Sequence, residues 1–217
     1  MKIAFQGERG AFSEEATVQY FGEVELFPCR TFAQGFDAVA RGDADGAVIP
    51  IENSQAGSIN DTYDLLLQHD LTIVGEVDLA VHHCLLAIPG VALQDVRKVY
   101  SHPQALAQCE EYLVELRAEK IAAYDTAGSA KMLREWFVAE NAQWKESAAI
   151  ASRRAGELYG LARLAEGIQT NPLNRTRFVV LAKAKSGTAK DAKNAKSLDE
   201  PIAWKTSIVF VTPNTPG

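Results

Sequence analysis

The fold is decided by one stretch near the C-terminal end of the chain: Asn174-Arg175-Thr176-Arg177-Phe178, followed directly by the apolar run Val179-Val180-Leu181. The apolar run predicts a buried strand over 177–183, with a hydroxyl and two guanidinium groups at its mouth. Open α/β sheets place their chemistry at strand ends beside loops. The two arginines favour an anionic ligand, and Thr176 supplies a neutral donor and acceptor between them. The alternative is a solvated strand flank without a function.

Outward from this strand, strand and helix patterns alternate along the chain. Strands are predicted over 2–6, 24–27, 47–51, 71–79, 82–88, 96–101, 121–124 and 148–151. Helices are predicted over 14–21 with Ser13 as cap, 32–41 with Thr31 as cap, 103–116, 127–137 and 153–159, and over a segment that begins at Ser58 or Asn60 and ends near His69. Alternation of this kind predicts an α/β fold of parallel sheets covered by helices.

The long extended stretch over 71–88 predicts a crossover between two α/β lobes with a cleft between them. We expect lobe one to comprise 1–78 and 168–184, with the strand at 177–183 returning to it, and lobe two to comprise 79–167. Residues 185–204 are rich in lysine and poor in large apolar side chains, which is typical of a linker. Residues 205–217 begin another strand, and one strand cannot bury its own face. A partner chain or a further domain is therefore expected.

Composition restricts the classes of function. The 217 residues are 47% hydrophobic, enough for one large domain or two lobes. The net charge of −6 argues against a nucleic-acid partner, although a local arginine cluster can still bind a small anion. No apolar stretch is long enough to cross a bilayer, and the N-terminal residues run into a strand pattern without a signal peptide. We expect no membrane partner.

The cysteines and histidines give no metal or disulfide pattern. Cys29, Cys84 and Cys109 are far apart and odd in number, which predicts reduced, structural thiols and a cytoplasmic location. His82 and His83 are adjacent, not four residues apart on one helix face. We expect no metal.

Three further strand ends carry polar groups. They are Pro50-Ile51-Glu52-Asn53-Ser54, Ser101-His102-Pro103-Gln104 and Tyr124-Asp125-Thr126-Ala127. Each precedes a predicted helix, whose N-terminus could help to bind an anion. The alternatives are ordinary helix caps, tight packing around Ala127 and, for His102, a surface or structural histidine. Glu52 is the one acid placed near the cleft, with a capping or bracing role favoured over that of a general base.

The side chains predicted at the site are therefore neutral hydroxyls and amides, together with arginine. No Ser-His-Asp set, glycosidase-like carboxylate pair or nucleotide-binding glycine loop is identified. Such a site suits an anionic substrate whose reaction needs positioning and hydrogen bonding rather than a strong nucleophile.

In these motifs, and in their order and spacing, the chain resembles bacterial prephenate dehydratases over essentially its whole length. The matching residues are Ile3 to Gly7, Gly10 to Ser13, Pro50 to Ser54, Gly57 to Ile59, Asp64 to Leu66, Ser101 to Gln104, Gln108 with Cys109, Asp125 to Ala127, Ala148 to Ser152 and Asn174 to Phe178. The triplet at 176–178 is the hallmark of the family.

The resemblance implies decarboxylative dehydration of prephenate to phenylpyruvate in phenylalanine biosynthesis, without a metal or organic cofactor. It implies two lobes like a type 2 periplasmic binding protein, with the active site between them. An ACT (α+β) regulatory domain usually follows, and 205–217 look like its first strand and turn, so we expect a truncated chain. L-phenylalanine would be the effector of the full-length protein only. A homo-oligomer, dimer or tetramer, is also implied.

The resemblance also assigns roles by motif. Thr176 would donate a hydrogen bond to the departing hydroxyl, and Asn53, Ser101 and Gln108 would orient the catalytic groups. The substrate-binding residues would be Arg177, paired with a carboxylate, and Ser54, Thr126, Ala127 and Phe178. The rival substrate is arogenate, the amino-bearing analogue, and the sequence places no acidic group to meet its ammonium. A plain small-anion binding module, without turnover, is the rival from another class.

Overall fold

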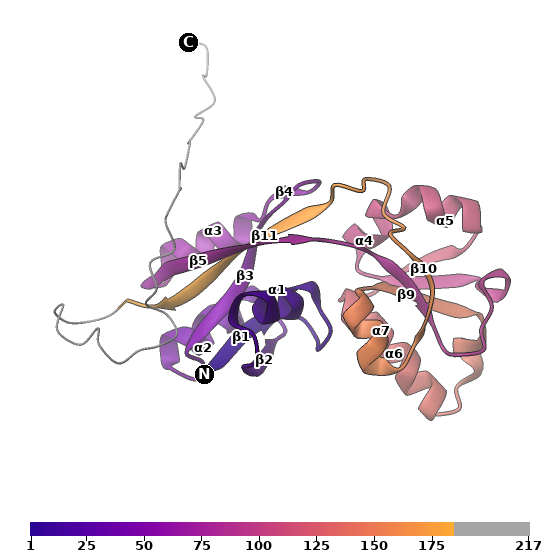
Figure 1. Cartoon of the computed structure of the whole chain (residues 1–217), viewed down its shortest axis with the longest axis horizontal. Helices are drawn as coiled ribbons and strands as arrows, with labels where there is room; N and C mark the ends of the chain where they lie inside the picture. The colour runs from indigo at the N-terminus through magenta and orange to yellow at the C-terminus, as the bar shows by residue number, and fades with distance from the viewer. Residues whose placement is uncertain (185–217) are drawn as a thin grey trace, which may run out of the picture. The chain divides into compact units, whose positions relative to one another are not determined.

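The first sheet is built on the N-terminal strands, in the order β2-β1-β3-β11-β5, with β4 paired to β3. The computed structural model describes residues 1–184, whose helices and strands are shown in Figure 1. β1 pairs in parallel with both β2 and β3. The elements of this sheet and its helices are β1 (Lys2–Gln6), α1 (Phe12–Phe21), β2 (Glu25–Cys29), α2 (Phe32–Arg41), β3 (Gly46–Asn53), β4 (Gly57–Ser58), α3 (Asn60–Gln68), β5 (Leu71–Ala80) and β11 (Arg175–Lys183).

The second sheet has the order β10-β6-β9-β7-β8. β7 pairs in parallel with β8 and β9, whereas β6 is antiparallel to both β9 and β10. Its elements are β6 (Cys84–Ala87), η1 (Leu93–Asp95), β7 (Lys98–Ser101), α4 (Pro103–Gln108), α5 (Glu110–Leu116), β8 (Glu119–Ala122), α6 (Thr126–Val138), η2 (Ala142–Glu146), β9 (Ser147–Ala151), α7 (Arg153–Tyr159) and β10 (Ala162–Glu166).

The α/β class is confirmed, but the prediction of parallel sheets is wrong because both sheets are mixed. β5 leads out of the first sheet towards β6, and β11 returns after β10. A strand that returns beside the one that left must run the opposite way, and β11 is antiparallel to both β5 and β3. The C-terminal ends of β3 and β5 and the N-terminal end of β11 therefore share one edge, where Thr176 is the register partner of Asn53 and Leu79.

Several predicted element boundaries are corrected. The helix expected over 103–116 breaks at Cys109 into α4 and α5. Ser13 lies inside α1, which begins after Ala11 without a side-chain cap. Thr31 does cap α2, since its side chain accepts a hydrogen bond from the backbone N–H of Gln34 at 3.2 Å.

Buried apolar side chains cover both faces of each sheet. At the first sheet they include Phe5 on β1, Phe178 on β11 and Phe36 on α2. Cys84 and Cys109 are fully buried in the second, and burial raises the pKa of their thiols to about 11 and about 12, respectively. Thiols of this kind are structural rather than reactive.

In the described part of the chain, none of the helices is both long enough and apolar enough to cross a membrane. The predicted linker at 185–204 and the predicted start of an ACT domain at 205–217 lie outside the described residues.

Candidate functional site

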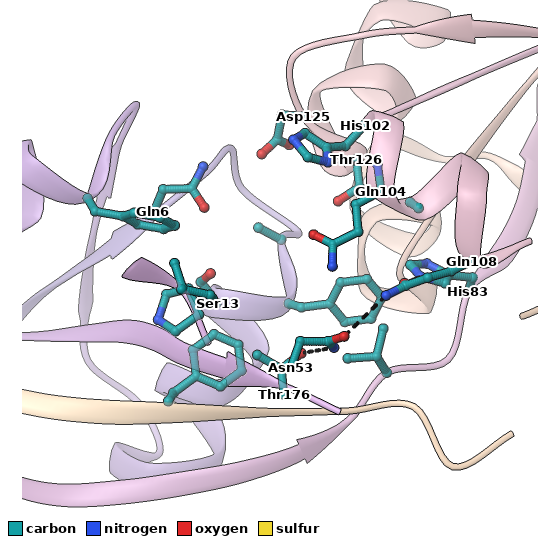
Figure 2. Close-up of a pocket in the computed structure, with 18 of the residues that line it drawn as sticks. Gln6, Ser13, Asn53, His83, His102, Gln104, Gln108, Asp125, Thr126 and Thr176 are labelled. Atoms are coloured by element: carbon teal, nitrogen blue, oxygen red, sulfur yellow. Dashed lines mark hydrogen bonds between the residues drawn. The ribbon is translucent and has the colours of Figure 1, made fainter. Parts of the chain in front are cut away.

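A pocket of about 240 Å³ is lined by residues from the strands, helices and loops of both sheets. In Figure 2, Asn53 and Thr176 lie together on one side, and Asp125, His102 and Thr126 gather on the other. The polar side chains in the lining are Gln6, Ser13, Asn53, His83, His102, Gln104, Gln108, Tyr124, Asp125, Thr126 and Thr176. The apolar lining includes Phe12, Phe32, Pro50, Ile59 and Phe178.

The orientation of the Asn53 amide is fixed by the backbone that follows it. Asn53 Oδ1 accepts hydrogen bonds from the backbone N–H groups of Gln55 and Ala56, at 3.0 Å each. Because a backbone nitrogen only donates, the accepting atom is the amide oxygen and the other is the nitrogen. Nδ2 of Asn53 then donates to Thr176 Oγ1 at 2.9 Å.

The hydrogen of the Thr176 hydroxyl is consequently not donated to Asn53. The amide nitrogen of Asn53 is a donor only, so the hydrogen of Thr176 does not point to it. The same nitrogen also approaches Asn174 Oδ1 at 2.9 Å and the carbonyl of Arg175 at 3.0 Å, so three acceptors share its two hydrogens. The hydrogen of the Thr176 hydroxyl is thus not used in the contact with Asn53, and Thr176 is part of the pocket lining.

The same order of donors and acceptors continues to Gln108 and His83. Gln108 Nε2 donates to Asn53 Oδ1 at 3.3 Å, and Gln108 Oε1 accepts from Asn174 Nδ2 at 3.0 Å. His83 Nε2 lies 2.8 Å from the same oxygen, so it carries the proton and donates. His83 Nδ1 is buried and has no hydrogen-bond partner among the described residues. Burial lowers the pKa of His83, against the opposing effect of the Gln108 hydrogen bond, so the ring is neutral at pH 7.

The other side of the pocket carries a carboxylate, Asp125. It is 7% exposed, and its Oδ1 accepts a hydrogen bond from the backbone N–H of Gly128 at 2.7 Å, which caps α6. Burial raises the pKa of the Asp125 carboxyl, while the Gly128 hydrogen bond acts in the opposite direction. His102 caps α4, since its Nδ1 accepts from the backbone N–H of Gln104 at 3.2 Å.

Five of the predicted site residues line this one pocket: Thr176, Asn53, Gln108, Thr126 and Phe178. They come from β11, β3, α4 and α6, so segments far apart in the sequence meet here. Their catalytic and binding roles stay predictions.

Arg177 lies outside the lining, contrary to the prediction of a contact with substrate. Glu52, for which a capping or bracing role is predicted, also lies outside it. Side chains alternate along a strand, so Arg177 faces away from the side on which Thr176 and Phe178 line the pocket. Arg177 Nη2 lies 3.2 Å from Glu52 Oε2, and their side chains are 47% and 46% exposed. The two residues pair with each other across β11 and β3.

Ser101, Ser54 and Ala127 also lie outside the lining. Ser101 is fully buried, and its hydroxyl donates to the carbonyl of Ile150 at 2.7 Å, which ties β7 to β9. Ser54 Oγ accepts from the backbone N–H of Arg175 at 2.9 Å. Ala127 is buried at the start of α6. The structure therefore gives Ser54 and Ala127 supporting positions rather than the predicted contacts with substrate, and it places Ser101, predicted to orient catalytic groups, in the interior of the second sheet.

Sequence reasoning does not find His83 or Gln6 as pocket residues, and it treats Asp125 as a helix cap. Glu52 is the acid expected near the cleft, but Asp125 is the acid in the lining. The position of each residue at the end of a strand could have identified it. Gln6 ends β1 and Asp125 follows β8, and both strands run towards the pocket.

The lining contains no lysine or arginine from residues 1–184. Within the same residues, no group of three histidine, cysteine, aspartate or glutamate side chains could hold a metal ion. The pocket therefore offers one oriented hydroxyl donor, several amides, a buried carboxylate and an apolar wall. These groups can position a ligand and donate hydrogen bonds to a departing oxygen.

Comparisons with known proteins give a consistent family. A sequence model of the family described as "Prephenate dehydratase" matches residues 3–186. Arogenate dehydratase 1 from Petunia hybrida is 48% identical to this chain over 217 residues, which cover 99% of this chain and 47% of that protein. The chain spans about half the length of the curated relatives that it matches.

Two solved structures share the fold closely. Prephenate dehydratase from Arthrobacter aurescens, in complex with L-Phe, matches with a TM-score of 0.77 and 31% identity, covering 86% of this chain and 61% of that chain. GqqA, described as a novel type of quorum-quenching acylase, matches with a TM-score of 0.77 and 41% identity, covering 86% of this chain and 66% of that chain.

Proposed function

The chain belongs to the prephenate dehydratase family, and from this premise we propose that it catalyses the decarboxylative dehydration of prephenate to phenylpyruvate. The bond between the ring and its carboxylate breaks, and its electron pair completes the aromatic ring. The ring hydroxyl departs as hydroxide and takes up one proton to become water. The products are phenylpyruvate, CO₂ and water.

One observation carries this proposal: the Thr176 hydroxyl accepts a hydrogen bond from Asn53 Nδ2 at 2.9 Å and does not donate its own hydrogen to Asn53. A departing hydroxide needs a donor that is already oriented, because charge develops on that oxygen in the transition state. Threonine is a weak acid, so its role is stabilisation of the leaving oxygen, with the proton completing water supplied by solvent.

The apolar wall fits the other half of the reaction. Phe12, Ile59 and Phe178 line the pocket, and a carboxylate held only by such side chains loses CO₂ more readily than one held by a cation. We propose that the leaving carboxylate lies against this wall. A complex with a substrate analogue in which both carboxylates form ion pairs would contradict this placement.

The proposal is tested with two substitutions of Thr176. Thr176→Val keeps the shape and removes the donor, and we expect kcat to fall by about 10²- to 10³-fold with little change in KM. Thr176→Ser keeps the hydroxyl and should retain most of the activity. Phenylpyruvate formed from prephenate is measured by absorbance in base, and unfolding curves show that the variants are folded. Equal kcat for Thr176→Val and the natural chain would refute the role of Thr176.

A second substrate, arogenate, is favoured by the name of the petunia relative, an arogenate dehydratase. The reaction on arogenate breaks the same bonds and yields phenylalanine instead of phenylpyruvate. Parallel assays of both products decide between the two substrates.

An acylase activity, named for the neighbour GqqA, is less well supported. Hydrolysis of an amide needs a nucleophile activated by a base. Among residues 1–184, no serine or threonine hydroxyl forms a hydrogen bond with a histidine ring: Thr176 is bonded to Asn53, and His83 to Gln108. We expect no release of acid from an N-acyl homoserine lactone.

We also propose that the complete protein is a homo-oligomer of the bacterial type, in which L-phenylalanine is the effector of an ACT domain beginning near residue 205. The Arthrobacter enzyme is in complex with L-Phe, which supports the choice of effector by analogy with that relative. Inhibition by phenylalanine, compared between this chain and the complete protein, tests this proposal.

A further inference from the structure

The charge of the pocket does not match the substrate of the proposed reaction in its keto form. Prephenate carries two carboxylates, whereas the lining from residues 1–184 contains the carboxylate of Asp125 and no lysine or arginine. Two like charges in a site shielded from water repel each other strongly. A ligand that brings its own cation to Asp125 removes this conflict.

Asp125 has one oxygen available for such a cation. Its Oδ1 accepts from the backbone N–H of Gly128 at 2.7 Å, and no side chain among residues 1–184 forms a hydrogen bond with Oδ2. Figure 2 shows the Asp125 carboxylate directed towards the space that separates it from Gln6. A Cβ atom at Gly7 would come within 3.0 Å of Oδ2, so glycine at this position leaves the oxygen uncovered.

A matching cation lies beside the same pocket. A second pocket shares Gln6, Phe32 and His102 with the first and is also lined by Arg30. The Arg30 guanidinium lies 5.6 Å from the centroid of the Tyr124 ring, next to Asp125 in the sequence. Among the described residues it forms no ion pair with a carboxylate. Arg30 and Asp125 therefore flank one tyrosine with opposite charges.

We propose that Asp125 and Arg30 form a receptor for an α-amino-acid head group, in which Asp125 binds the ammonium and Arg30 binds the adjoining carboxylate. The inference rests on the proposed dehydratase function and chooses between its two candidate substrates, because it makes Asp125 the residue that favours the amino side chain of arogenate over the keto side chain of prephenate. An ammonium donates to a carboxylate, whereas a keto oxygen only accepts and would be repelled by it.

The buried position distinguishes Asp125 from the other acids nearby. Asp61 and Asp64 line the second pocket, but both are exposed to water. Glu8 is engaged, since its carboxylate accepts from Tyr124 Oη at 2.9 Å and from Lys131 Nζ at 3.0 Å. A charge pair discriminates best where it is shielded from solvent.

The test uses two neutral substitutions that keep the helix cap, Asp125→Ser and Asp125→Asn, because each retains an oxygen that accepts from Gly128 N–H. For each variant, kcat/KM is measured with arogenate and with prephenate. We expect kcat/KM for arogenate to fall by about 30-fold or more relative to the value for prephenate. Arg30→Gln should lower both values, since both substrates carry the side-chain carboxylate. Asp64→Asn, a matched exposed carboxylate, should leave the ratio of the two values unchanged.

The outcomes separate the two proposals. If the natural chain turns over neither substrate, the proposed function fails and the receptor fails with it. If it turns over either one and both Asp125 variants keep the natural ratio, the receptor is refuted and the dehydratase function stands. A shift of the ratio in Asp64→Asn alone would refute the assignment to Asp125. Should one Asp125 variant fail to fold, the ratio in the other decides.

Discussion

At the scale of single residues, the direction of each hydrogen bond in the site follows from two backbone N–H groups. The amides of Gln55 and Ala56 fix Asn53, Asn53 fixes Thr176 and Gln108, and Gln108 fixes the tautomer of His83. These directions follow because each step involves a group that can only donate, such as a backbone N–H, or one that can only accept, such as an amide oxygen. The orientation of the Thr176 hydroxyl thus depends on a turn in the backbone.

This order of donors predicts a severe effect for a change of one atom, Asn53→Asp. One carboxylate oxygen can still accept from the backbone, but the other would accept from Thr176 instead of donating to it. The Thr176 hydrogen would then point away from the substrate. We expect kcat to fall by about 10²-fold, as for loss of the donor itself, with the fold retained. Steady-state kinetics with prephenate and arogenate measure this effect, and a variant with natural kcat would show that the direction assigned to the hydrogen bond is wrong.

Sequence reasoning misplaces some residues because a motif does not show which face of a strand a side chain occupies or whether it is buried. The triplet at 176–178 marks the site, but only the alternation of side chains in the paired strand separates Thr176 and Phe178 from Arg177, which pairs with Glu52. Burial likewise keeps Ser101 out of the pocket, because its hydroxyl donates a hydrogen bond to a backbone carbonyl. Neither the face of a strand nor the partner of a hydroxyl can be deduced from a single motif.

At the scale of elements, the loop at 7–10 is held against the start of α7. The Ser152 hydroxyl donates to the carbonyl of Gly10 at 2.6 Å and accepts from the backbone N–H of Ala155 at 3.0 Å. Gly10 has a φ of +88°, and a Cβ atom there would lie 2.7 Å from the Cα of Ala155. The glycine thus allows both the turn and the close approach of two backbones.

We therefore expect Gly10→Ala to be more destabilising than a matched change elsewhere. Gly22 also has a positive φ, +70°, but a Cβ atom there would meet nothing within 4 Å. Gly22→Ala should lower the free energy of unfolding by about 1 kcal/mol through backbone strain alone. Gly10→Ala should cost about 1–3 kcal/mol more, because α7 must also move. Urea denaturation of both variants measures the difference, and equal losses would mean that the loop and α7 are not tightly packed.

The elements themselves were predicted well where a hydrophobic pattern was long, as in β3, α2 and β11. β10 is missed because Ala162–Glu166 has no continuous apolar run and no strict alternation of apolar and polar residues. The direction of β11 also cannot be predicted from the local sequence pattern, because it depends on the chain having left the first sheet through β5.

At the scale of residues 1–184 as a whole, a buried carboxylate joins the elements of the two sheets. Glu14 on α1 is fully buried. Its Oε2 accepts from Arg9 Nε at 2.9 Å and from the backbone N–H of Gly10 at 2.8 Å, and its Oε1 accepts from Arg154 Nε on α7 at 2.7 Å. Burial opposes ionisation of Glu14, but these three hydrogen bonds outweigh it and hold the pKa of the carboxyl below its usual value of 4.5.

The stability of the protein and its dependence on pH should both reflect the charge of Glu14. Glu14→Gln removes the charge between two arginines, and we expect the free energy of unfolding at pH 7 to fall by about 3 kcal/mol. The neighbouring Glu15→Gln is the control, because burial raises the pKa of Glu15 and its charge opposes folding at neutral pH. This change should leave stability equal or slightly higher.

The pH profile follows from the sign of each shift. A lowered pKa means that the unfolded chain binds more protons, so the contribution of Glu14 is present above pH 4.5 and is lost as the pH falls through the folded-state pKa. The stability of the natural chain should therefore decline in acid more steeply than that of Glu14→Gln. Glu15 acts in the opposite sense, since its contribution is lost as the pH rises. Urea denaturation between about pH 3 and pH 7 compares the three chains, and parallel curves for the natural chain and Glu14→Gln would show that this carboxylate does not hold α1 to α7.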